Sequence, residues 1–166
     1  MQEIGLGGSC HWCTEPIFQS LKGVNQVQQG WLSTTTEPDV FYEGILVNFE
    51  SDISLHTLIN IHLHTHSCTS QHALRARYLS AVYCFNDHQQ KQAQTIIKKC
   101  QSEFTKPLLT QAVCFAHFKS SRDDILNYYY QNPDKPFCQT RITPKLKKLL
   151  KQFPELISND KKAWIK

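Results

Sequence analysis

The chain has 166 residues, of which 40% are hydrophobic and 19% are charged, and its formal net charge is +4. This composition is typical of a globular domain with its own core, and it excludes a disordered chain. No apolar run spans a membrane, no secretory leader is visible, and the lysines near the end are not interleaved with aromatic residues, so we expect no membrane and no nucleic acid as partner. The seven cysteines are odd in number and irregularly spaced, which predicts a reducing compartment, the cytoplasm.

Apolar periodicity predicts alternating strands and helices along the chain. Strands are expected at residues 2–6, 24–32, 40–49, 78–85 and 108–117. Helices are expected at 11–22, 53–62, 87 to about 104, 122–131 and around 146–153, with a loop at 34–39 and a polar loop at 63–77. This order, β-α-β-β-α-β-α-β, indicates an α+β fold in a single domain, with a mixed sheet, a ferredoxin-like βαββαβ core and helices packed on the sheet.

The segment Gly7-Gly8-Ser9-Cys10 joins the first predicted strand to the first predicted helix. A helix N-terminus presents unpaired N–H groups and the positive end of the peptide dipoles, so a thiol placed there tends to have a lowered pKa and to react as the thiolate. The glycines also let the backbone approach a ligand closely. We therefore favour a reactive Cys10 over a cysteine that only fills the junction between strand and helix.

Cys13 forms a Cys-x-x-Cys pair with Cys10. It could resolve an oxidised Cys10, supply half of a zinc site, or be an ordinary helix residue at the edge of the apolar face. The sequence has no second Cys-x-x-Cys, so zinc would need ligands from the polar loop. A disulfide across one helical turn is strained unless the turn loosens, which makes Cys138, in a predicted loop, a competing thiol.

Glu43 shares strand parity with Ile45, Val47 and Phe49, so its side chain is expected on the core side of the sheet. An ionised carboxylate is costly to bury, and this cost favours the protonated form. A neutral carboxyl near pH 7 is what a general acid requires. The alternative is a carboxylate at the wet end of the strand, because a predicted loop lies only four residues away.

A histidine-rich stretch runs from the second predicted helix into the polar loop. Its members are His62, His64, His66, Cys68 and His72. Such side chains could bind Zn²⁺, but we favour a polar loop whose imidazoles are exposed or hydrogen-bonded to the backbone. His62 differs because it lies on the apolar stripe of its helix, where we expect it to be buried. Of the remaining cysteines, those expected in the core are Cys84, Cys100 and Cys114.

The chain resembles the type A peptide methionine sulfoxide reductases over roughly residues 3–150. Ser9-Cys10-His11-Trp12 stands where that family has Gly-Cys-Phe-Trp, and Glu43 stands where the family has its catalytic glutamate. The stretch 61–78 matches the family's active-site loop without a gap. His62 then corresponds to the family's histidine, and Tyr78 corresponds to its catalytic tyrosine. Similar segments follow at Ser80-Ala81-Val82-Tyr83, Tyr128-Tyr129, Asn132-Pro133 and Pro136-Phe137-Cys138.

The resemblance implies an oxidoreductase that reduces methionine S-sulfoxide, free or in proteins, and so repairs oxidative damage. It implies that the catalytic residues are Cys10, Glu43 and Tyr78. The Cys10 thiolate would attack the sulfoxide sulfur and end as a sulfenic acid, while the other two donate protons to the oxygen. Substrate contacts would come from His11, Trp12 and His62, and the resolving thiol would be Cys13 or Cys138.

The resemblance also sets expectations for cofactors, partners and domain organisation. No metal and no bound cofactor is expected. The reductant would be an external thiol, a thioredoxin-like protein or dithiothreitol, and the substrate methionine sulfoxide or an oxidised protein. We expect a monomer with a catalytic domain at 1–153 and a C-terminal tail at 154–166.

The sequence departs from the family mainly in substrate recognition. The family's loop aspartate falls on Ala73, its motif phenylalanine is His11, and its second active-site tyrosine has no clear counterpart near 34–39. The extra histidines His64, His66 and His72 are candidates to replace these contacts. Two alternatives follow: a catalytically inactive relative that binds peptides, and a Cys/His zinc-binding module.

Overall fold

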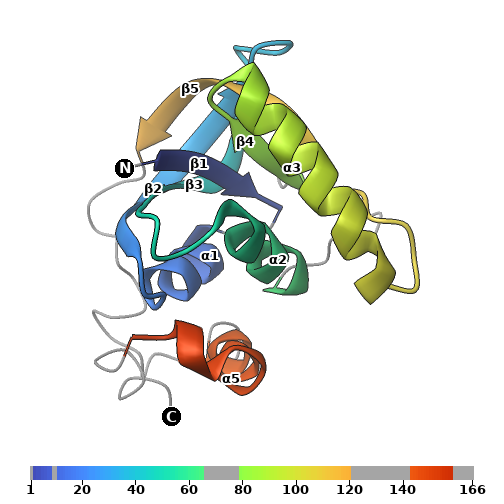
Figure 1. Cartoon of the computed structure of the whole chain (residues 1–166). Coiled ribbons are helices and arrows are strands. Elements are labelled where there is room, and N and C mark those ends of the chain that lie inside the picture. Colours follow the sequence, from blue (N-terminus) through green and yellow to red (C-terminus); the bar gives the residue numbers. More distant parts are fainter. Residues whose placement is uncertain (1, 9–10, 66–78, 121–142, 159–166) are drawn as a thin grey trace.

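The computed structural model describes residues 2–8, 11–65, 79–120 and 143–158, apart from the side chains of residues 11–13. In this part of the chain, five strands close into a barrel in the order β1-β3-β2-β5-β4. They are β1 (Gln2–Gly7), β2 (Val24–Thr34), β3 (Tyr42–Phe49), β4 (Ala81–Cys84) and β5 (Gln111–Ser120). Figure 1 shows α1 (His11–Gln19) and α2 (Leu55–Thr65) on one side of the barrel, with α3 (Asp87–Cys100) along another side and α5 (Thr143–Gln152) below.

The strand pairing makes the sheet a mixed one. β1 pairs with β3 and β4, and β2 pairs with β3 and β5, all antiparallel. β4 and β5 run parallel and complete the ring. The predicted α+β class, with a mixed sheet and helices packed on it, is confirmed. The expected ferredoxin-like core has an open sheet, whereas here β5 lies between β2 and β4 and closes it.

The barrel wall separates two apolar layers. Its outer side faces the helices and carries Ile4, Ile45 and Val82, which pack with Phe18 of α1 and Leu58 of α2. Its inside is filled by a second cluster formed by Leu32, Leu46, Ala81 and Tyr83. The interior leaves little room, because a Cβ atom on Gly5 of β1 would lie 2.8 Å from the Leu32 side chain of β2, two strands away.

Helix α1 ends at Gln19, three residues before the predicted end. The backbone after α1 pairs with the C-terminal segment instead of continuing the helix. The Lys22 N–H donates a hydrogen bond to the Leu156 carbonyl, and Leu21 forms a β-bridge with Ile157. Gly23 follows with a φ of 87°, a left-handed conformation that glycine adopts at low cost and that is common just after a helix.

Helix α2 runs beyond its predicted end at residue 62 to Thr65. Ser54 caps its start by accepting a hydrogen bond from the Thr57 N–H at 3.1 Å. At the other end the Thr65 hydroxyl donates to the Ile61 carbonyl at 2.8 Å, and Leu63 is buried. The predicted polar loop therefore begins later than 63, and its remainder lies outside the described residues.

Helix α3 begins as predicted at Asp87, directly after its N-cap Asn86, whose side chain accepts a hydrogen bond from the Gln89 N–H at 2.8 Å. The α-helix ends at Cys100 and continues as one 3₁₀ turn, η1 (Gln101–Glu103), which accounts for the predicted end near 104. The last strand, β5, is shifted three residues toward the C-terminus relative to its prediction, because its later part pairs with β2. The predicted helix 122–131 lies outside the described residues.

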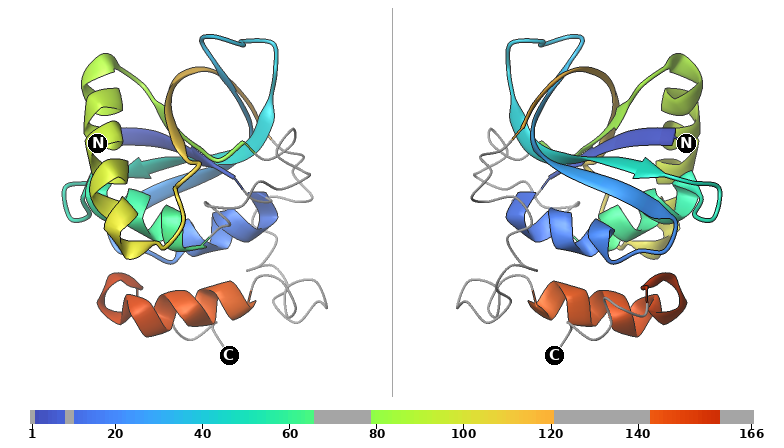
Figure 2. Two further views of the ribbon diagram at one scale, coloured as in Figure 1. Left: turned by 90° about the vertical axis from the view of Figure 1, so that its right-hand side faces the viewer. Right: turned by 90° about the vertical axis from the view of Figure 1, so that its left-hand side faces the viewer.

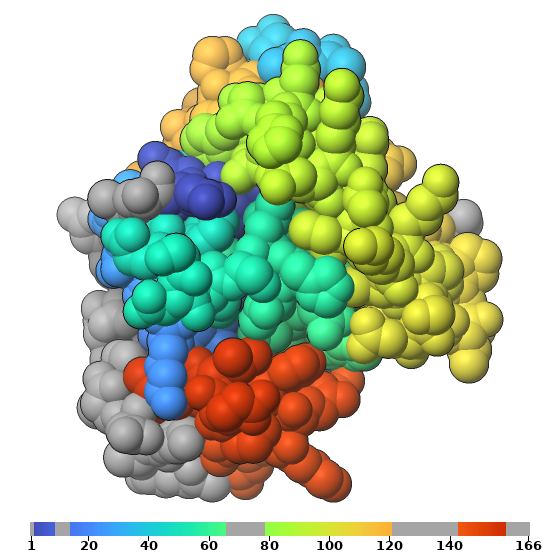
Figure 3. All heavy atoms as spheres, in the orientation of Figure 1, coloured from blue at the N-terminus to red at the C-terminus, as the bar shows by residue number. Residues whose placement is uncertain are grey.

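The predicted last helix is confirmed as α5, which buries Leu146 and Leu149 against α1 and α2. Both side views show α5 below α1 and α2, on the side away from the barrel (Figure 2). A 3₁₀ turn, η4 (Pro154–Leu156), leads to Ile157, which is 0% exposed. Figure 3 shows α3 and α5 as separate ridges on the surface, with α2 visible between them. No helix in the described ranges is long and apolar enough to cross a membrane.

Candidate active site

Glu43 is the predicted catalytic side chain that the structure describes. It lies on β3, the strand between β1 and β2, directly opposite Trp31 of β2, and is 0% exposed. Ile45 and Val47, which share its parity, belong to the cluster under the helices. Glu43 therefore faces the helices and not the inside of the barrel. The predicted core-facing carboxyl is confirmed, and a solvated position at the end of the strand is wrong.

The strands approach one another closely beside Glu43. Gly44 pairs with Gly7 of β1 on one side and with Gly30 of β2 on the other. A Cβ atom on Gly44 would lie 2.7 Å from the backbone oxygen of Leu6, so any larger residue would push β1 away from β3. The end of β1 is thereby held beside the strand that carries Glu43.

Helix α1 covers the same face of the sheet. It begins at His11, directly after Cys10 in the sequence, and packs on β2 and β3. The predicted strand-to-helix junction is confirmed. Cys10, Tyr78 and Cys138 lie outside the described residues, and the side chains at positions 11–13 are not described either. The roles of these residues, including His11, Trp12 and Cys13, stay predictions.

His62 lies on α2 and is 1% exposed, so its predicted burial is confirmed. Its ring centroid is 6.3 Å from that of Phe18 on α1, with the two rings inclined by 54°. The imidazole therefore lies at the packing interface of α1 and α2, in the same apolar layer that Glu43 faces.

Two further buried polar side chains lie near this face and were not singled out in the sequence. Gln29 of β2 is 0% exposed and pairs with Ile45, so it points to the same side of the sheet as Glu43. Glu15 of α1 is 2% exposed. The strand parity of Gln29 was a readable signal, whereas nothing in the local pattern indicates that Glu15 is buried.

His64 was predicted in a polar loop, and this is wrong because α2 continues through it. Its Nε2 lies 3.1 Å from Oε1 of Glu103, and its ring is stacked on Phe104 with centroids 4.7 Å apart. Lys148 of α5 donates from Nζ to the His64 carbonyl at 3.1 Å. These contacts point to a structural role at the junction of α2, η1 and α5. His66, Cys68 and His72 lie outside the described residues.

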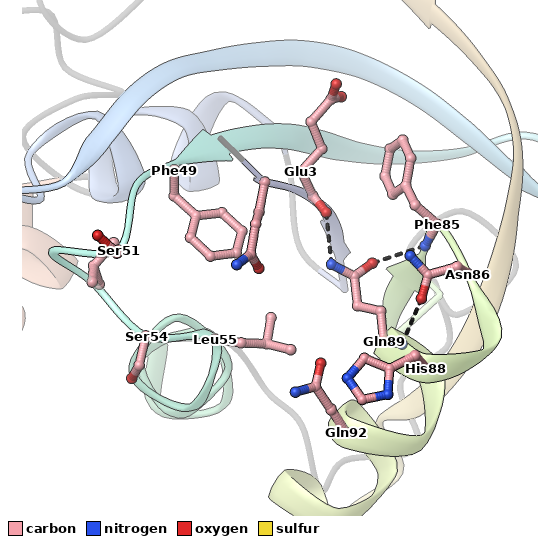
Figure 4. A pocket seen from close by; sticks show the side chains of 12 residues that line it. Glu3, Phe49, Ser51, Ser54, Leu55, Phe85, Asn86, His88, Gln89 and Gln92 are labelled. Atoms are coloured by element: carbon pink, nitrogen blue, oxygen red, sulfur yellow. Dashed lines mark hydrogen bonds between the residues drawn. The ribbon is translucent and has the colours of Figure 1, made fainter.

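A cavity of about 680 Å³ lies at the end of β3 that is away from Glu43 (Figure 4). Phe49 and Leu55 line it together with Asn86, the N-cap of α3, and Gln89 in the first turn of that helix. Phe49 is six residues beyond Glu43 on β3, about 20 Å along the strand, so the cavity is separate from the Glu43 region. Across the described residues, no three His, Cys, Asp or Glu side chains are arranged to hold a metal ion.

Comparison with known proteins gives matches along nearly the whole chain. Residues 2–156 match the family model described as peptide methionine sulfoxide reductase. The peptide methionine sulfoxide reductase MsrA of Trichodesmium erythraeum is 31% identical over 175 residues, which cover 95% of this chain and 99% of the relative.

Solved structures show the same fold at lower sequence identity. Reduced Mxr1 from Saccharomyces cerevisiae superposes with a TM-score of 0.69 at 18% identity, covering 84% of this chain and 90% of that one. The crystal structure of Mxr1 in complex with Trx2 matches with a TM-score of 0.61 at 17% identity, covering 73% and 81%.

These matches identify an enzyme of the oxidoreductase class that acts on methionine sulfoxide. The chain belongs to the peptide methionine sulfoxide reductase family. The family and the activity implied by the sequence resemblance are confirmed.

Proposed function

We propose that this enzyme reduces the S epimer of methionine sulfoxide, free or within proteins, with Cys10 as nucleophile and Glu43 as proton donor. One observation carries the proposal: Glu43 is 0% exposed on the sheet face that α1 covers, and α1 begins directly after Cys10. The helix N-terminus favours a thiolate at that position, and the buried carboxyl lies on the sheet face that this helix covers.

The chemistry follows from these two groups. The Cys10 thiolate attacks the sulfoxide sulfur, and Glu43 protonates the oxygen on which negative charge develops. Tyr78 donates a second hydrogen bond to this oxygen. The sulfur–oxygen bond of the substrate then breaks, methionine leaves with two more electrons than the sulfoxide held, and Cys10 carries the oxygen as a sulfenic acid. Trp12 provides an apolar wall for the substrate methyl group, and His11 and His62 complete the substrate contacts.

A second thiol returns Cys10 to its starting state. Cys13 or Cys138 attacks the sulfenic sulfur, a disulfide forms, and the hydroxyl leaves as water. A thioredoxin-like dithiol, or dithiothreitol in the test tube, then reduces the disulfide. The complex of the similar Mxr1 with Trx2 supports a reductant of this kind.

We also propose how the chain is organised. The strand neighbours β4-β1-β3-β2 are antiparallel, which supports a ferredoxin-like unit to which β5 is added. The catalytic domain spans 1–153, and the tail 154–166 begins with η4 and Ile157 packed near the end of α1. The enzyme works as a monomer. It works in the cytoplasm, and the odd number of seven cysteines supports such a reducing compartment.

The test is turnover of separated epimers. The protein is incubated with S or R methionine sulfoxide and dithiothreitol, and methionine is measured, with Cys10→Ser as the control. We expect turnover of the S epimer only, and its loss in Cys10→Ser. Turnover that survives Cys10→Ser would overturn the role of this thiol, and no turnover of either epimer would favour the peptide-binding or zinc-binding alternative.

A further inference from the structure

Two cysteines outside the candidate active site lie opposite each other on neighbouring strands. Cys84 is the last residue of β4, and its Cα partner on the parallel strand β5 is Cys114. Neighbouring strands are about 4.8 Å apart, and the Cα atoms of disulfide-bonded cysteines are roughly 4.4–6.8 Å apart. The backbone therefore already holds these two residues at a spacing that a disulfide can bridge.

Both thiols lie on the side of the sheet that faces α3. Cys84 belongs to the apolar cluster under the helices. Cys114 donates from Sγ to Oε1 of Gln90 on α3 at 3.4 Å, while the Gln90 amide nitrogen donates to the carbonyl of Ala112 on β5 at 3.2 Å. Both cysteines are free in this structure.

The two cysteines differ in their exposure to solvent. Cys84 is 1% exposed, and burial, with a further contribution from nearby Cys114, raises the pKa of the Cys84 thiol to about 12. Cys114 is only partly buried. A small oxidant in solution therefore reaches Cys114 first, while Cys84 remains a protonated thiol behind it.

We propose that Cys84 and Cys114 are a second redox site, which hydrogen peroxide oxidises to a cross-strand disulfide. The Cys114 thiolate attacks a peroxide oxygen, a sulfur–oxygen bond forms, the oxygen–oxygen bond breaks, and the leaving hydroxide takes a proton to become water. The Cys84 sulfur then attacks the Cys114 sulfur, a sulfur–sulfur bond forms, and the hydroxyl leaves as water with the Cys84 proton. The two thiols lose two electrons, and one peroxide becomes two waters.

This pair is separate from the Glu43 region. Ala81 lies at the level of Gly7 and Gly44, and Cys84 is three residues further along β4, about 10 Å away. β1 also lies between β4 and β3, so Cys84 is two strand spacings across the sheet from Glu43. The proposal does not depend on Cys10, and its test does not measure methionine sulfoxide reduction.

The test maps the linked peptides after oxidation. Trypsin places Cys84 in residues 78–91 and Cys114 in residues 100–119, because Lys106 precedes a proline and is not cut. Cys100 shares the second fragment, so the full-length Cys100→Ala variant is used beside the wild type. Each protein is treated with hydrogen peroxide, its remaining thiols are alkylated, and the digest is analysed by mass spectrometry.

We expect fragment 78–91 linked to fragment 100–119, and we expect the link to disappear after dithiothreitol. In a matched Cys84→Ala variant the link is absent, and a dimedone adduct on Cys114 traps the sulfenic acid. In the wild type, fragmentation of the linked peptides assigns the same pair, which covers the case in which Cys100→Ala does not fold. The proposal is overturned if both cysteines are still alkylated after treatment with a large molar excess of hydrogen peroxide, or if Cys114 is linked to another cysteine.

Discussion

Glu43 is a carboxyl group placed where an aliphatic side chain would be the stable choice. Its strand neighbours of equal parity, Ile45 and Val47, are 0% exposed and pack under the helices. Burial of an acidic group costs free energy, and residues that carry such a cost are typically functional. Glu43 can therefore be tested by separating activity from stability.

In the Glu43→Gln variant we expect kcat for the S sulfoxide to fall by about a hundredfold or more, because a general acid typically contributes a factor of that size. KM should change little, since the amide has nearly the same shape. Steady-state kinetics with dithiothreitol as reductant measures both constants.

The matched control is Glu37→Gln, which removes an exposed carboxyl from the loop before β3 and should leave kcat unchanged. A Glu43→Gln enzyme with wild-type kcat would refute the role of Glu43 as proton donor. A fall in both variants would point to an effect of net charge instead.

Cys100 provides a prediction about pH. Burial, with contributions from the neighbouring Glu103 charge and a hydrogen bond to it, raises the pKa of the Cys100 thiol to about 11 from a usual value of 9.0. Above pH 9 the unfolded chain loses this proton while the folded chain keeps it. The contribution of Cys100 to the free energy of unfolding is therefore fully present below pH 9 and is lost as the pH rises toward 11.

We expect the free energy of unfolding of the wild type to fall more steeply between pH 9 and about 11 than that of Cys100→Ala. The two curves should run parallel between pH 7 and 8, where the thiol is protonated in both states. Urea denaturation at a series of pH values measures the slopes. Equal slopes above pH 9 would show that Cys100 titrates normally in the folded protein.

At the residue scale, strand parity predicted the site in part. The period of two placed Glu43 on the core side, and the helical stripe placed His62 in the interior, because both patterns repeat over several residues. Gln29 was missed although its strand parity was a readable signal, because it follows another glutamine in a polar run. Glu15 was missed because its burial depends on the packing of α1 on β2 and β3, which no local pattern contains.

At the scale of elements, the C-terminal turn of α2 joins three parts of the molecule. His64 contacts Glu103 after α3, and the rings of Phe104 and Phe153 lie near it, with centroids 4.7 Å and 6.4 Å from that of the imidazole. The His64 carbonyl accepts a hydrogen bond from Nζ of Lys148 on α5. A residue expected in a loop thus positions two neighbouring elements.

We expect His64→Ala to lower the free energy of unfolding by about 1–2 kcal/mol, the sum of a stacked ring and a partly exposed hydrogen bond to Glu103. KM for methionine sulfoxide should stay within twofold, because these contacts are structural. Urea denaturation and steady-state kinetics test the two halves of the prediction.

The control in the same region is Lys147→Ala on α5, an exposed position that should change stability by less than about 0.5 kcal/mol. A large rise in KM for His64→Ala with unchanged stability would instead support the hypothesis that this histidine contacts the substrate.

The ends of the elements were harder to predict than their existence. The sequence pattern placed the start of α3 correctly because Asn86 is a local cap. It placed the end of α1 too late because the Lys22 N–H is taken by Leu156, more than 130 positions along the chain. Contacts this distant in sequence leave no local signal.

At the scale of the whole molecule, the chain beyond α5 returns to the body of the protein. Ile157 is 0% exposed, and the Ser158 N–H donates to the Ser20 carbonyl at 2.8 Å. This segment thus completes the core on the side of α1.

We expect Ile157→Ala to destabilise the protein by about 2–4 kcal/mol, and the matched Ile157→Val by about 0.5–1.5 kcal/mol, because the cost grows with the volume removed from a packed core. Urea denaturation of both variants measures this order. Equal and small losses would mean that the segment can leave the core without cost.

Closure of the sheet could not be predicted either. β5 carries the partly buried Phe115 and Phe118, which pack against the cluster inside the barrel, but its pattern does not say which strands it joins. Only the three-dimensional register, with β2 on one side and β4 on the other, reveals a ring instead of an open sheet.

Closure of the sheet also affects how this enzyme interacts with oxidised proteins. Oxidised proteins, its proposed substrates, expose unpaired backbone when damage loosens them, and such backbone readily adds to the rim of an open sheet. Each strand of this sheet already has a neighbour on both sides, and where the β1–β4 ladder stops, the Gln89 amide donates to the Glu3 carbonyl. Because the β2–β5 ladder begins only at Gly30 of β2, closure of the ring reduces the open strand edge that a damaged chain could join but does not remove it.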